Sequence, residues 1–308
     1  MEIKEHYNYK GWENCIFISN GKIELVATTD VGPRVIKFGA EGGKNLFKEN
    51  KDMLGKSGGD DWRSYGGHRL WHAPEEMPRT YFPDNSTVPY KINENTLILS
   101  QETEVSTGIK KEIEITMNEK ENFVKLVHRL INKNLWDVEL APWALTVMPE
   151  KTRVIVPQEP FGLHDDNMLP ARPLVLWSYT KMDDKRFKWG SRYIQLNQDP
   201  DSATCQKIGV TNTLGWMAGY LDGEIFVKRY SYSPLAIYPD MGCNSEVYTD
   251  SSIIELETLN SLEIVSPQGF IEHIEYWFYF KDIIKETEDS IDEKLLPLIS
   301  KTFKFCKF

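Results

Sequence analysis

Short runs in which apolar and polar residues alternate recur along this chain, and they restrict its possible folds more than any other property. In the run at 111–117, Ile113, Ile115 and Met117 fall on one side of an extended strand, while Glu112 and Glu114 fall on the other. Strands are expected at 15–19, 22–27, 34–38, 111–117, 123–130, 138–148, 154–156, 174–179, 192–196, 207–210, 215–221, 224–228, 245–248, 253–259, 262–265 and 271–280. Many short strands without alternating helices predict an antiparallel sandwich or barrel.

Turn signals agree with this interpretation. Asn20-Gly21 and Asp222-Gly223 each separate two strand-like runs, and both dipeptides favour the type I′ turn that joins antiparallel strands. Helix signals are few: Ser290 and Glu293 form a capping-box pattern, and Pro297 is expected to end the helix that begins there. The sequence therefore predicts one all-β domain over residues 1–308, with a short helix at about 287–297.

Composition excludes several classes of partner. The net charge is −10 and no basic run is present, which argues against nucleic acid. No apolar run approaches the roughly 18 residues of a membrane span, and the first residues contain no apolar signal segment. Four cysteines, Cys15, Cys205, Cys243 and Cys306, form no Cys-x-x-Cys pair, which favours reduced thiols. We expect a cytoplasmic protein with no nucleic-acid or membrane partner and no cofactor.

The densest group of chemically versatile side chains is the stretch from Tyr65 to Glu75. It holds His68, Arg69, Trp71 and His72 among two glycines and a proline, which predicts a structured loop. This stretch lies within a longer segment, residues 48–87, that has no clear periodicity. Long excursions of this kind often carry function, so we expect these side chains to belong to a binding site rather than to the core.

A second group of candidate residues lies near the carboxyl end. In strand geometry Glu255 and Glu257 point the same way, and Glu246 and Tyr248 have the same spacing in the preceding run. Neighbouring carboxylates repel each other, and partial burial raises a carboxyl pKa toward values that suit a general base. A solvated outer face is the alternative interpretation of these acids.

The remaining histidines have simpler explanations. His164 precedes Asp165-Asp166 in a segment bounded by proline and glycine, where consecutive acids more often form turns than metal sites, so we expect no metal there. His128 shares a strand face with Val124 and Leu130, which predicts a semi-buried, hydrogen-bonded histidine rather than a catalytic one.

Several motifs follow one order along the chain: Gly32-Pro-Arg-Val, Gly66-Gly67 ahead of Trp71 and Pro74, Ile254-Glu-Leu-Glu-Thr-Leu, and Pro267-Gln-Gly269 before a final aromatic strand. This order resembles the galactose mutarotase-like (aldose 1-epimerase-like) superfamily of sugar-binding supersandwiches. Narrower motifs resemble a bacterial branch of that superfamily: Gly66-Gly-His-Arg-Leu-Trp-His-Ala-Pro-Glu75, Ala141–Met148, Arg172–Trp177 and Glu246-Val-Tyr-Thr. The resemblance covers roughly residues 15 to 280. It implies an antiparallel β-supersandwich with little helix and a small-molecule sugar or sugar derivative as partner.

The resemblance also implies roles for particular residues. Glu257 matches the carboxylate that acts as general base in aldose mutarotases, and Glu255 and Glu246 are rival candidates for the same role. Trp143 stands about where the family has the histidine that protonates the ring oxygen, and an indole cannot serve as a general acid at neutral pH.

Three functional hypotheses follow from these observations. In a mutarotase, Glu257 or Glu246 would be the base and His68, His72 or His164 the acid; Arg69, Arg34, Trp71, Trp143, Glu255 and Tyr248 would hold the sugar. In a sugar-binding protein without chemistry, the same cleft would bind through aromatic platforms, and Trp143 favours this version. In a lyase or hydrolase that acts on an acidic glycan, Arg69, Arg153 and Arg172 would pair with uronate carboxylates.

Overall fold

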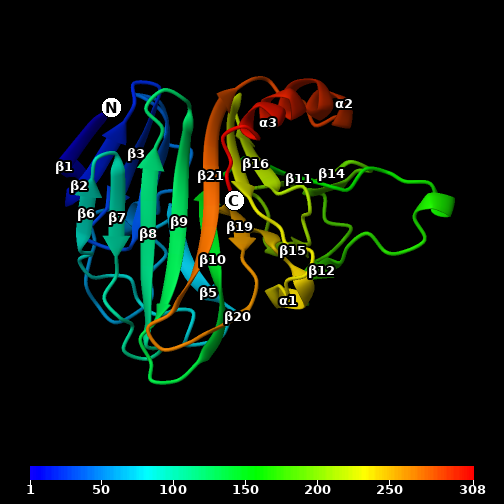
Figure 1. Ribbon diagram of the computed structural model, residues 1–308. Helices are drawn as coiled ribbons and strands as arrows, with labels where there is room; N and C mark the ends of the chain where they lie inside the picture. Colours follow the sequence, from blue (N-terminus) through cyan, green and yellow to red (C-terminus); the bar gives the residue numbers. More distant parts are fainter.

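The computed structural model describes residues 1–308, and it places the strands in two antiparallel sheets that pack face to face (Figure 1). Sheet 1 runs in the order β1 (Glu2–Tyr9), β2 (Trp12–Ser19), β3 (Ile23–Thr28), β4 (Arg34–Ala40), β5 (His68–Ala73), β10 (Val138–Met148), β19 (Ile254–Leu259), β18 (Ser245–Thr249), β15 (Gln206–Val210) and β12 (Leu174–Leu176), with β20 (Glu263–Val265) also paired to β10. Sheet 2 runs in the order β13 (Phe187–Trp189), β14 (Tyr193–Asn197), β11 (Arg153–Pro157), β16 (Trp216–Leu221), β17 (Glu224–Tyr230), β21 (Phe270–Lys281), β9 (Phe123–Asn132), β8 (Ile109–Met117), β7 (Thr96–Ser100) and β6 (Tyr90–Asn93). The expected all-β antiparallel supersandwich is confirmed.

Both turn dipeptides join paired strands as expected. Asp222 and Gly223 have φ values of +52° and +84° and link β16 to β17, which fits a type I′ turn. Between β2 and β3 only Gly21 has a positive φ, and the side-chain oxygen of Asn20 accepts hydrogen bonds from the backbone N–H groups of Lys22 and Ile23. The turn at Asn20-Gly21 is therefore closed by the side chain of Asn20.

Large aromatic side chains fill the space between the sheets. Phe38 of sheet 1 packs edge-on against Phe226 and Trp277 of sheet 2, with ring centroids 5.6 and 5.8 Å apart. Phe47 meets the same two rings at 5.2 and 5.4 Å, and all four side chains are almost fully buried. This contact fixes the two sheets against each other, so that sheet 1 has one face in the core and one face turned outward.

The carboxyl-terminal helical segment covers the outer face of sheet 2. It consists of α2 (Glu288–Ser290), the π-helical turn η3 (Ile291–Leu295) and α3 (Leu296–Thr302), and it buries Ile291, Leu295 and Ile299 against that sheet (Figure 1). The helical segment continues past Pro297 to Thr302, and Pro297 lies in the first turn of α3, directly after the π-helical turn η3. None of the helices is both long enough and apolar enough to cross a membrane.

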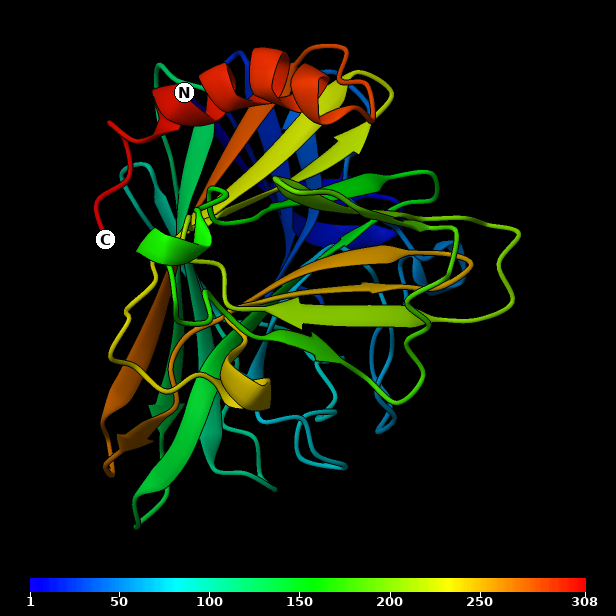
Figure 2. The ribbon, with the colours of Figure 1, turned by 90° about the vertical axis from the view of Figure 1, so that its right-hand side faces the viewer.

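Three other short helical turns interrupt the loops: η1 (Lys51–Met53), η2 (His164–Asp166) and α1 (Pro239–Gly242). The segment that carries η2 reaches away from both sheets in Figure 1 and points toward the viewer in Figure 2.

Gly67 lies directly before β5 at a position that excludes a side chain. Its φ is +71°, and a Cβ atom there would collide with the carbonyl oxygen of Val35, whereas Gly42 has a similar φ of +66° and open space around it. We expect Gly67→Ala to lower the free energy of unfolding by about 3 kcal/mol, and Gly42→Ala by only about 1 kcal/mol, because the second variant has backbone strain without a clash. Urea unfolding of both variants measures the difference. Equal losses would contradict the close approach of β5 to β4.

Candidate functional site

Neighbouring strands of sheet 1 place a set of polar and aromatic side chains on the face that points away from sheet 2. Residues that pair directly in antiparallel strands share a face. Trp71 of β5 lies opposite Trp143 of β10, and Leu145 of β10 lies opposite Glu257 of β19. Glu257 in turn lies opposite Glu246 of β18. The strand register therefore gathers residues that are far apart in sequence.

These side chains line a pocket of about 420 Å³. Its lining residues are Trp62, Ser64, Arg69, Trp71, Glu75, Tyr81, Trp143, Leu145, Tyr179, Lys207, Tyr248, Asp250, Ile253, Glu255 and Glu257. A larger groove of about 960 Å³, lined mostly by polar residues, adjoins it and shares Ser64, Asp250 and Ile253 with it. The smaller pocket falls within the size range of small-molecule sites.

Aromatic rings form one wall of the pocket. The rings of Trp71 and Trp143 meet edge to face with centroids 5.3 Å apart, and Tyr81 and Trp62 lie 4.9 and 5.8 Å from Trp71. The guanidinium of Arg69 lies over the Trp71 ring at 4.4 Å. The wall therefore combines flat apolar ring faces with the hydrogen-bond donors of the Arg69 guanidinium.

Lys207 is the central charge of the pocket floor. Its ammonium lies 3.0 Å from Oε2 of Glu257 and 2.7 Å from Glu246, between the rings of Trp143 and Trp177. Burial acts to lower the pKa of Lys207, but the two carboxyls outweigh it and raise that pKa well above the usual value. Burial also raises the pKa of Glu246 well above its usual value, against the opposing effect of Lys207. The buried group thus holds one ammonium between two carboxyls.

Two carboxylates present free acceptor capacity at this floor. The Trp143 indole N–H donates to Oε2 of Glu257 at 2.9 Å, but Oε1 of Glu257 is buried without a hydrogen-bond partner. Glu255 accepts one hydrogen bond from Arg69 at 3.2 Å, and burial raises its pKa in spite of that guanidinium. Nε of Arg69 also lacks a partner. Buried polar atoms without partners suit a ligand that supplies hydroxyl or amino groups.

The structure brings six of the predicted site residues to the pocket: Glu257, Glu255, Arg69, Trp71, Trp143 and Tyr248. Three other candidates lie elsewhere. Glu246 is buried behind Lys207, and Arg34 is fully buried, where its guanidinium donates to the carbonyl of Gly66 and pairs with Asp84. His164 lies on the projecting η2 segment with 86% of its side chain exposed.

His68 and His72 also lie outside the pocket, because they alternate with Arg69 and Trp71 along β5 and therefore point into the sandwich. Tyr65 to Glu75 was expected to form a loop; instead, residues 68–73 form a fully buried strand between β4 and β10. The prediction of a loop is wrong. Burial lowers the pKa of His68 well below its usual value, so its imidazole is neutral at pH 7.

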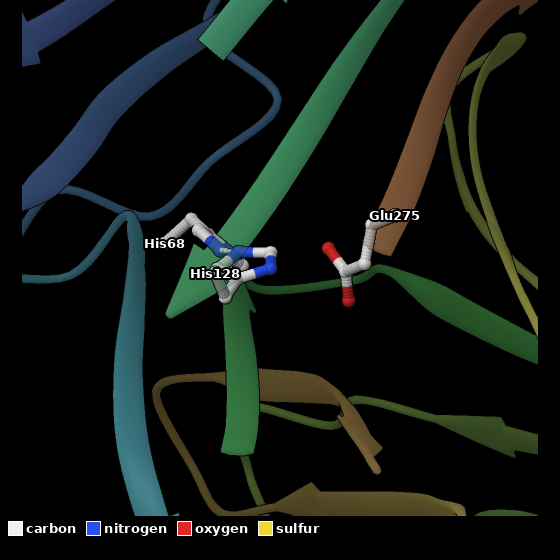
Figure 3. A group of neighbouring side chains, drawn as sticks. All are labelled: His68, His128 and Glu275. Atoms are coloured by element: carbon white, nitrogen blue, oxygen red, sulfur yellow. Dashed lines mark hydrogen bonds between the residues drawn. The ribbon is translucent and has the colours of Figure 1, made fainter. Parts of the chain in front are cut away.

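His68 belongs to a hydrogen-bond network between the two sheets (Figure 3). Its Nε2 lies 2.7 Å from Nε2 of His128, and its Nδ1 lies 2.8 Å from the hydroxyl of Thr146. The carbonyl of His273 only accepts, so Nδ1 of His128 donates to it at 3.0 Å, and Nε2 of His128 must accept from His68. Burial lowers the pKa of His128 to about 4. His128 is hydrogen-bonded as expected, but it is fully buried rather than semi-buried.

Glu275 lies beside this histidine pair, and the three side chains form the group whose geometry comes nearest to a metal site. Both carboxylate oxygens are already engaged, however. Oε1 accepts from Lys228 at 2.9 Å and from Thr258, and Oε2 accepts from the Trp277 indole at 2.6 Å. A cation would have to displace these donors and the hydrogen bond between the imidazoles. The donor set fits a hydrogen-bond network better than a metal site.

His72 belongs to a separate buried cluster with Glu104 and Lys111. Nε2 of His72 lies 3.3 Å from Glu104, and the ammonium of Lys111 lies 2.5 Å from the same carboxylate. Burial acts to raise the pKa of Glu104, but Lys111 and His72 outweigh it and lower that pKa to about 2. Burial lowers the pKa of His72, so the lysine is the main counter-charge.

The depressed pKa of Glu104 predicts an acid-sensitive contribution to stability. A carboxyl whose pKa is lower in the folded state stabilises the fold above its unfolded pKa, and that stabilisation is lost as the pH falls from about 4.5 through about 2. We expect Glu104→Gln to lower the free energy of unfolding by about 3 kcal/mol at pH 7 and by much less at pH 3. Urea unfolding at both values tests this, and a loss independent of pH would contradict it.

Several residues of the pocket were not predicted from the sequence: Trp62, Tyr81, Tyr179 and Lys207. Lys207 is the most important of these. It begins an apolar run and therefore resembles the solvated end of a strand. No local pattern marks Lys207 as a site residue; it reaches the pocket because it pairs with Tyr248 of β18.

No family model matches the sequence, and no curated protein matches it. Solved structures do. A TPR-domain protein from Parabacteroides distasonis superposes with a TM-score of 0.61 at 13% identity, over 88% of this chain and 48% of that one. A galactose mutarotase-like protein from Lactobacillus casei gives 0.54 at 10% identity, over 87% of this chain and 100% of that one. A galactose mutarotase related enzyme from Lactobacillus acidophilus gives 0.51 at 9% identity, over 88% and 99%.

The chain spans about half the length of the first of these proteins and nearly the whole length of the other two. Identities of 9% to 13% carry information about the fold alone. The sheet order, the packing of the two sheets and these superpositions lead to the same conclusion: the chain has the galactose mutarotase-like fold.

Proposed function

We propose that this protein binds a carbohydrate in the pocket between Trp71, Trp143 and Glu257. The observation that carries the proposal is the pairing of flat indole faces with a buried carboxylate oxygen that has no partner, inside a pocket of about 420 Å³. Sugars present apolar C–H faces beside hydroxyl groups, so they need both kinds of contact. The mutarotase-like neighbours in fold support the same ligand class.

Each group in the pocket has a role in such a complex. The sugar ring would stack on Trp71 or Trp143, and its hydroxyls would donate to Oε1 of Glu257 and accept from Arg69. Lys207 holds Glu257 in place from below through its 3.0 Å contact. The adjoining groove leaves room for substituents beyond one ring.

A second candidate function is the interconversion of sugar anomers. Glu257 has a free oxygen to take the proton of the anomeric hydroxyl, and Glu255, whose pKa is raised by burial, would give a proton to the ring oxygen. In this reaction the general acid is a carboxyl and not an imidazole, because His68 and His72 point into the core. Ring opening, rotation and closure on the other face would then exchange the anomers.

The arginines give less support to an acidic glycan as substrate. Arg69 pairs with Glu255, Arg172 pairs with Glu159 at 2.8 Å, and Arg153 lies in β11 of sheet 2. None of them offers an unpaired guanidinium beside the others in the pocket, as recognition of uronates would need.

Calorimetric titration with a panel of aldoses and amino sugars tests the proposal. We expect Trp71→Leu, which keeps an apolar core but removes the stacking face, to weaken binding at least about tenfold. The matched control is Trp136→Leu, since that indole is 64% exposed and is absent from the pocket lining. Unchanged affinity in Trp71→Leu, or equal losses in both variants, would contradict binding at this site.

A further inference from the structure

The ionisable groups that line the pocket are unbalanced. Four carboxyls, from Glu75, Asp250, Glu255 and Glu257, face two cations, Arg69 and Lys207. Both cations are committed: Arg69 to Glu255 and Lys207 to Glu257 and Glu246. The pocket therefore has an excess of acidic groups and no unpaired cation.

Two of these carboxyls have acceptor atoms available at the floor. Oε1 of Glu257 is buried and has no hydrogen-bond partner, and Glu257 itself is fully buried. Glu255 lies two residues away on the same strand face, and one guanidinium contact is its only hydrogen bond. A buried carboxylate oxygen is stabilised most by a charged donor. The two residues together form an acceptor site for a cation.

The walls around this acceptor site are aromatic. Trp62, Tyr81, Tyr179 and Tyr248 line the pocket together with the indoles of Trp71 and Trp143. Aromatic faces attract cations through their ring quadrupoles, and cages of this kind recognise ammonium groups. The protein's own cations already lie over three of these rings: Arg69 lies 4.4 Å from the Trp71 centroid and 5.9 Å from that of Trp62, and Lys207 lies 4.8 Å from that of Trp143. The rings of Tyr81, Tyr179 and Tyr248 have no such cation and add aromatic surface for the ammonium group of a ligand.

We propose that the sugar bound here carries a positively charged amino group, which donates hydrogen bonds to Glu255 and to Oε1 of Glu257. The inference rests on the proposed carbohydrate-binding function and names the class of sugar. An amino sugar supplies the donor that Glu257 lacks and the charge that offsets the acidic excess. A uronate or a sugar phosphate would meet those carboxylates without an unpaired cation to receive it.

Calorimetric titration at pH 6.5 with glucosamine, galactosamine, N-acetylglucosamine, glucose and glucuronate tests the inference. Acetylation removes the charge but adds bulk, whereas glucose has a hydroxyl in place of the amine, so the two neutral sugars together isolate the effect of the ammonium. We expect at least one of the free amines to bind about tenfold or more tighter than either neutral sugar, and glucuronate to bind weakest. Neutral sugars that bind as tightly as the amines would overturn the inference while the proposed function stands. No binding by any sugar would overturn both.

Two variants locate the preference. Glu255→Gln keeps the side-chain volume and removes one charge, and we expect it to reduce the preference for glucosamine over glucose about tenfold. The control is Glu139→Gln, an exposed carboxylate on β10 outside the pocket, which should leave the preference unchanged. A preference that survives Glu255→Gln intact would contradict the role assigned to that carboxylate. Thermal melts of both variants confirm that they are folded.

Discussion

Replacing Lys228 by methionine should lower the free energy of unfolding by about 3–5 kcal/mol. The ammonium of Lys228 is fully buried between the sheets and lies 2.9 Å from Glu275. It also donates to the carbonyls of Ala144 and Leu256, on strands β10 and β19, at 3.2 and 3.0 Å. Removal of the cation leaves a buried carboxylate without its counter-charge and two carbonyls without a donor. Urea unfolding at pH 7 measures the loss.

The control for this variant is Lys91→Met, at an exposed position of β6, which should change stability by no more than about 0.5 kcal/mol. The double variant Lys228→Met/Glu275→Gln removes both charges, so it should recover part of the loss, and a double-mutant cycle gives the coupling energy. A loss below about 1 kcal/mol in Lys228→Met would show that the buried ion pair does not hold the sheets together as described.

Replacing Glu257 by glutamine should weaken sugar binding by about 10- to 100-fold. The carboxylate is the acceptor at the pocket floor, and hydrogen bonds to charged groups contribute about 1.5–3 kcal/mol each. Glutamine has nearly the same shape and its oxygen still accepts from Trp143, so the pocket keeps its form. Lys207 keeps a counter-charge as well, because Glu246 lies 2.7 Å away and can ionise in its place. Calorimetric titration with the tightest sugar of the panel gives the change in Kd.

Glu246→Gln provides the matched comparison. Burial raises the pKa of Glu246, so this carboxyl carries its proton more readily than an exposed one, and glutamine resembles the protonated form. Glu246 is also absent from the pocket lining. We expect its replacement to change Kd by less than about threefold. If both variants lose affinity equally, the sugar does not depend on Glu257 in the way proposed.

Much of the fold was predictable because many strands have one polar and one apolar face. In β8 alternate residues are buried and half-exposed along the whole strand, which is the pattern that residues 111–117 predict. The turn at Asp222-Gly223 was predictable for a local reason, since both residues adopt positive φ values. Signals of this kind are contained within a few neighbouring residues.

Strand β5 was not predictable because it is buried on both faces. His68 and Leu70 contact the core, while Arg69 and Trp71 face the pocket, so polar and apolar residues occur on both sides. Alternation disappears in such a strand, and the surrounding glycines suggest a loop instead. The sequence therefore predicts His68 and His72 in the binding site, whereas both belong to the core. The sequence thus indicates which side chains are chemically versatile, but it does not indicate the face of β5 on which each of them lies.

The composition of the pocket depends on the order of strands in sheet 1. Glu255 and Glu257 could be paired from their spacing alone, whereas Lys207 joins them only because β15 and β18 are neighbours. Trp62 and Tyr81 come from the long excursion before and after β5, whose path no local pattern indicates. Pairing between strands that are far apart in sequence therefore determines the part of the site that local sequence patterns do not predict.

The most direct test of carbohydrate binding at this pocket uses the indole N–H signals of the nine tryptophans in a two-dimensional ¹H–¹⁵N spectrum. The Trp143 indole donates to Glu257 at the pocket floor, and Trp136 is an exposed reporter elsewhere on the surface. Addition of glucosamine or glucose should shift the Trp143 and Trp71 signals with a saturable dose dependence and leave Trp136 unchanged. Unchanged Trp143 and Trp71 signals at sugar concentrations that saturate binding, or throughout the panel, would contradict the assignment of this pocket as a carbohydrate site.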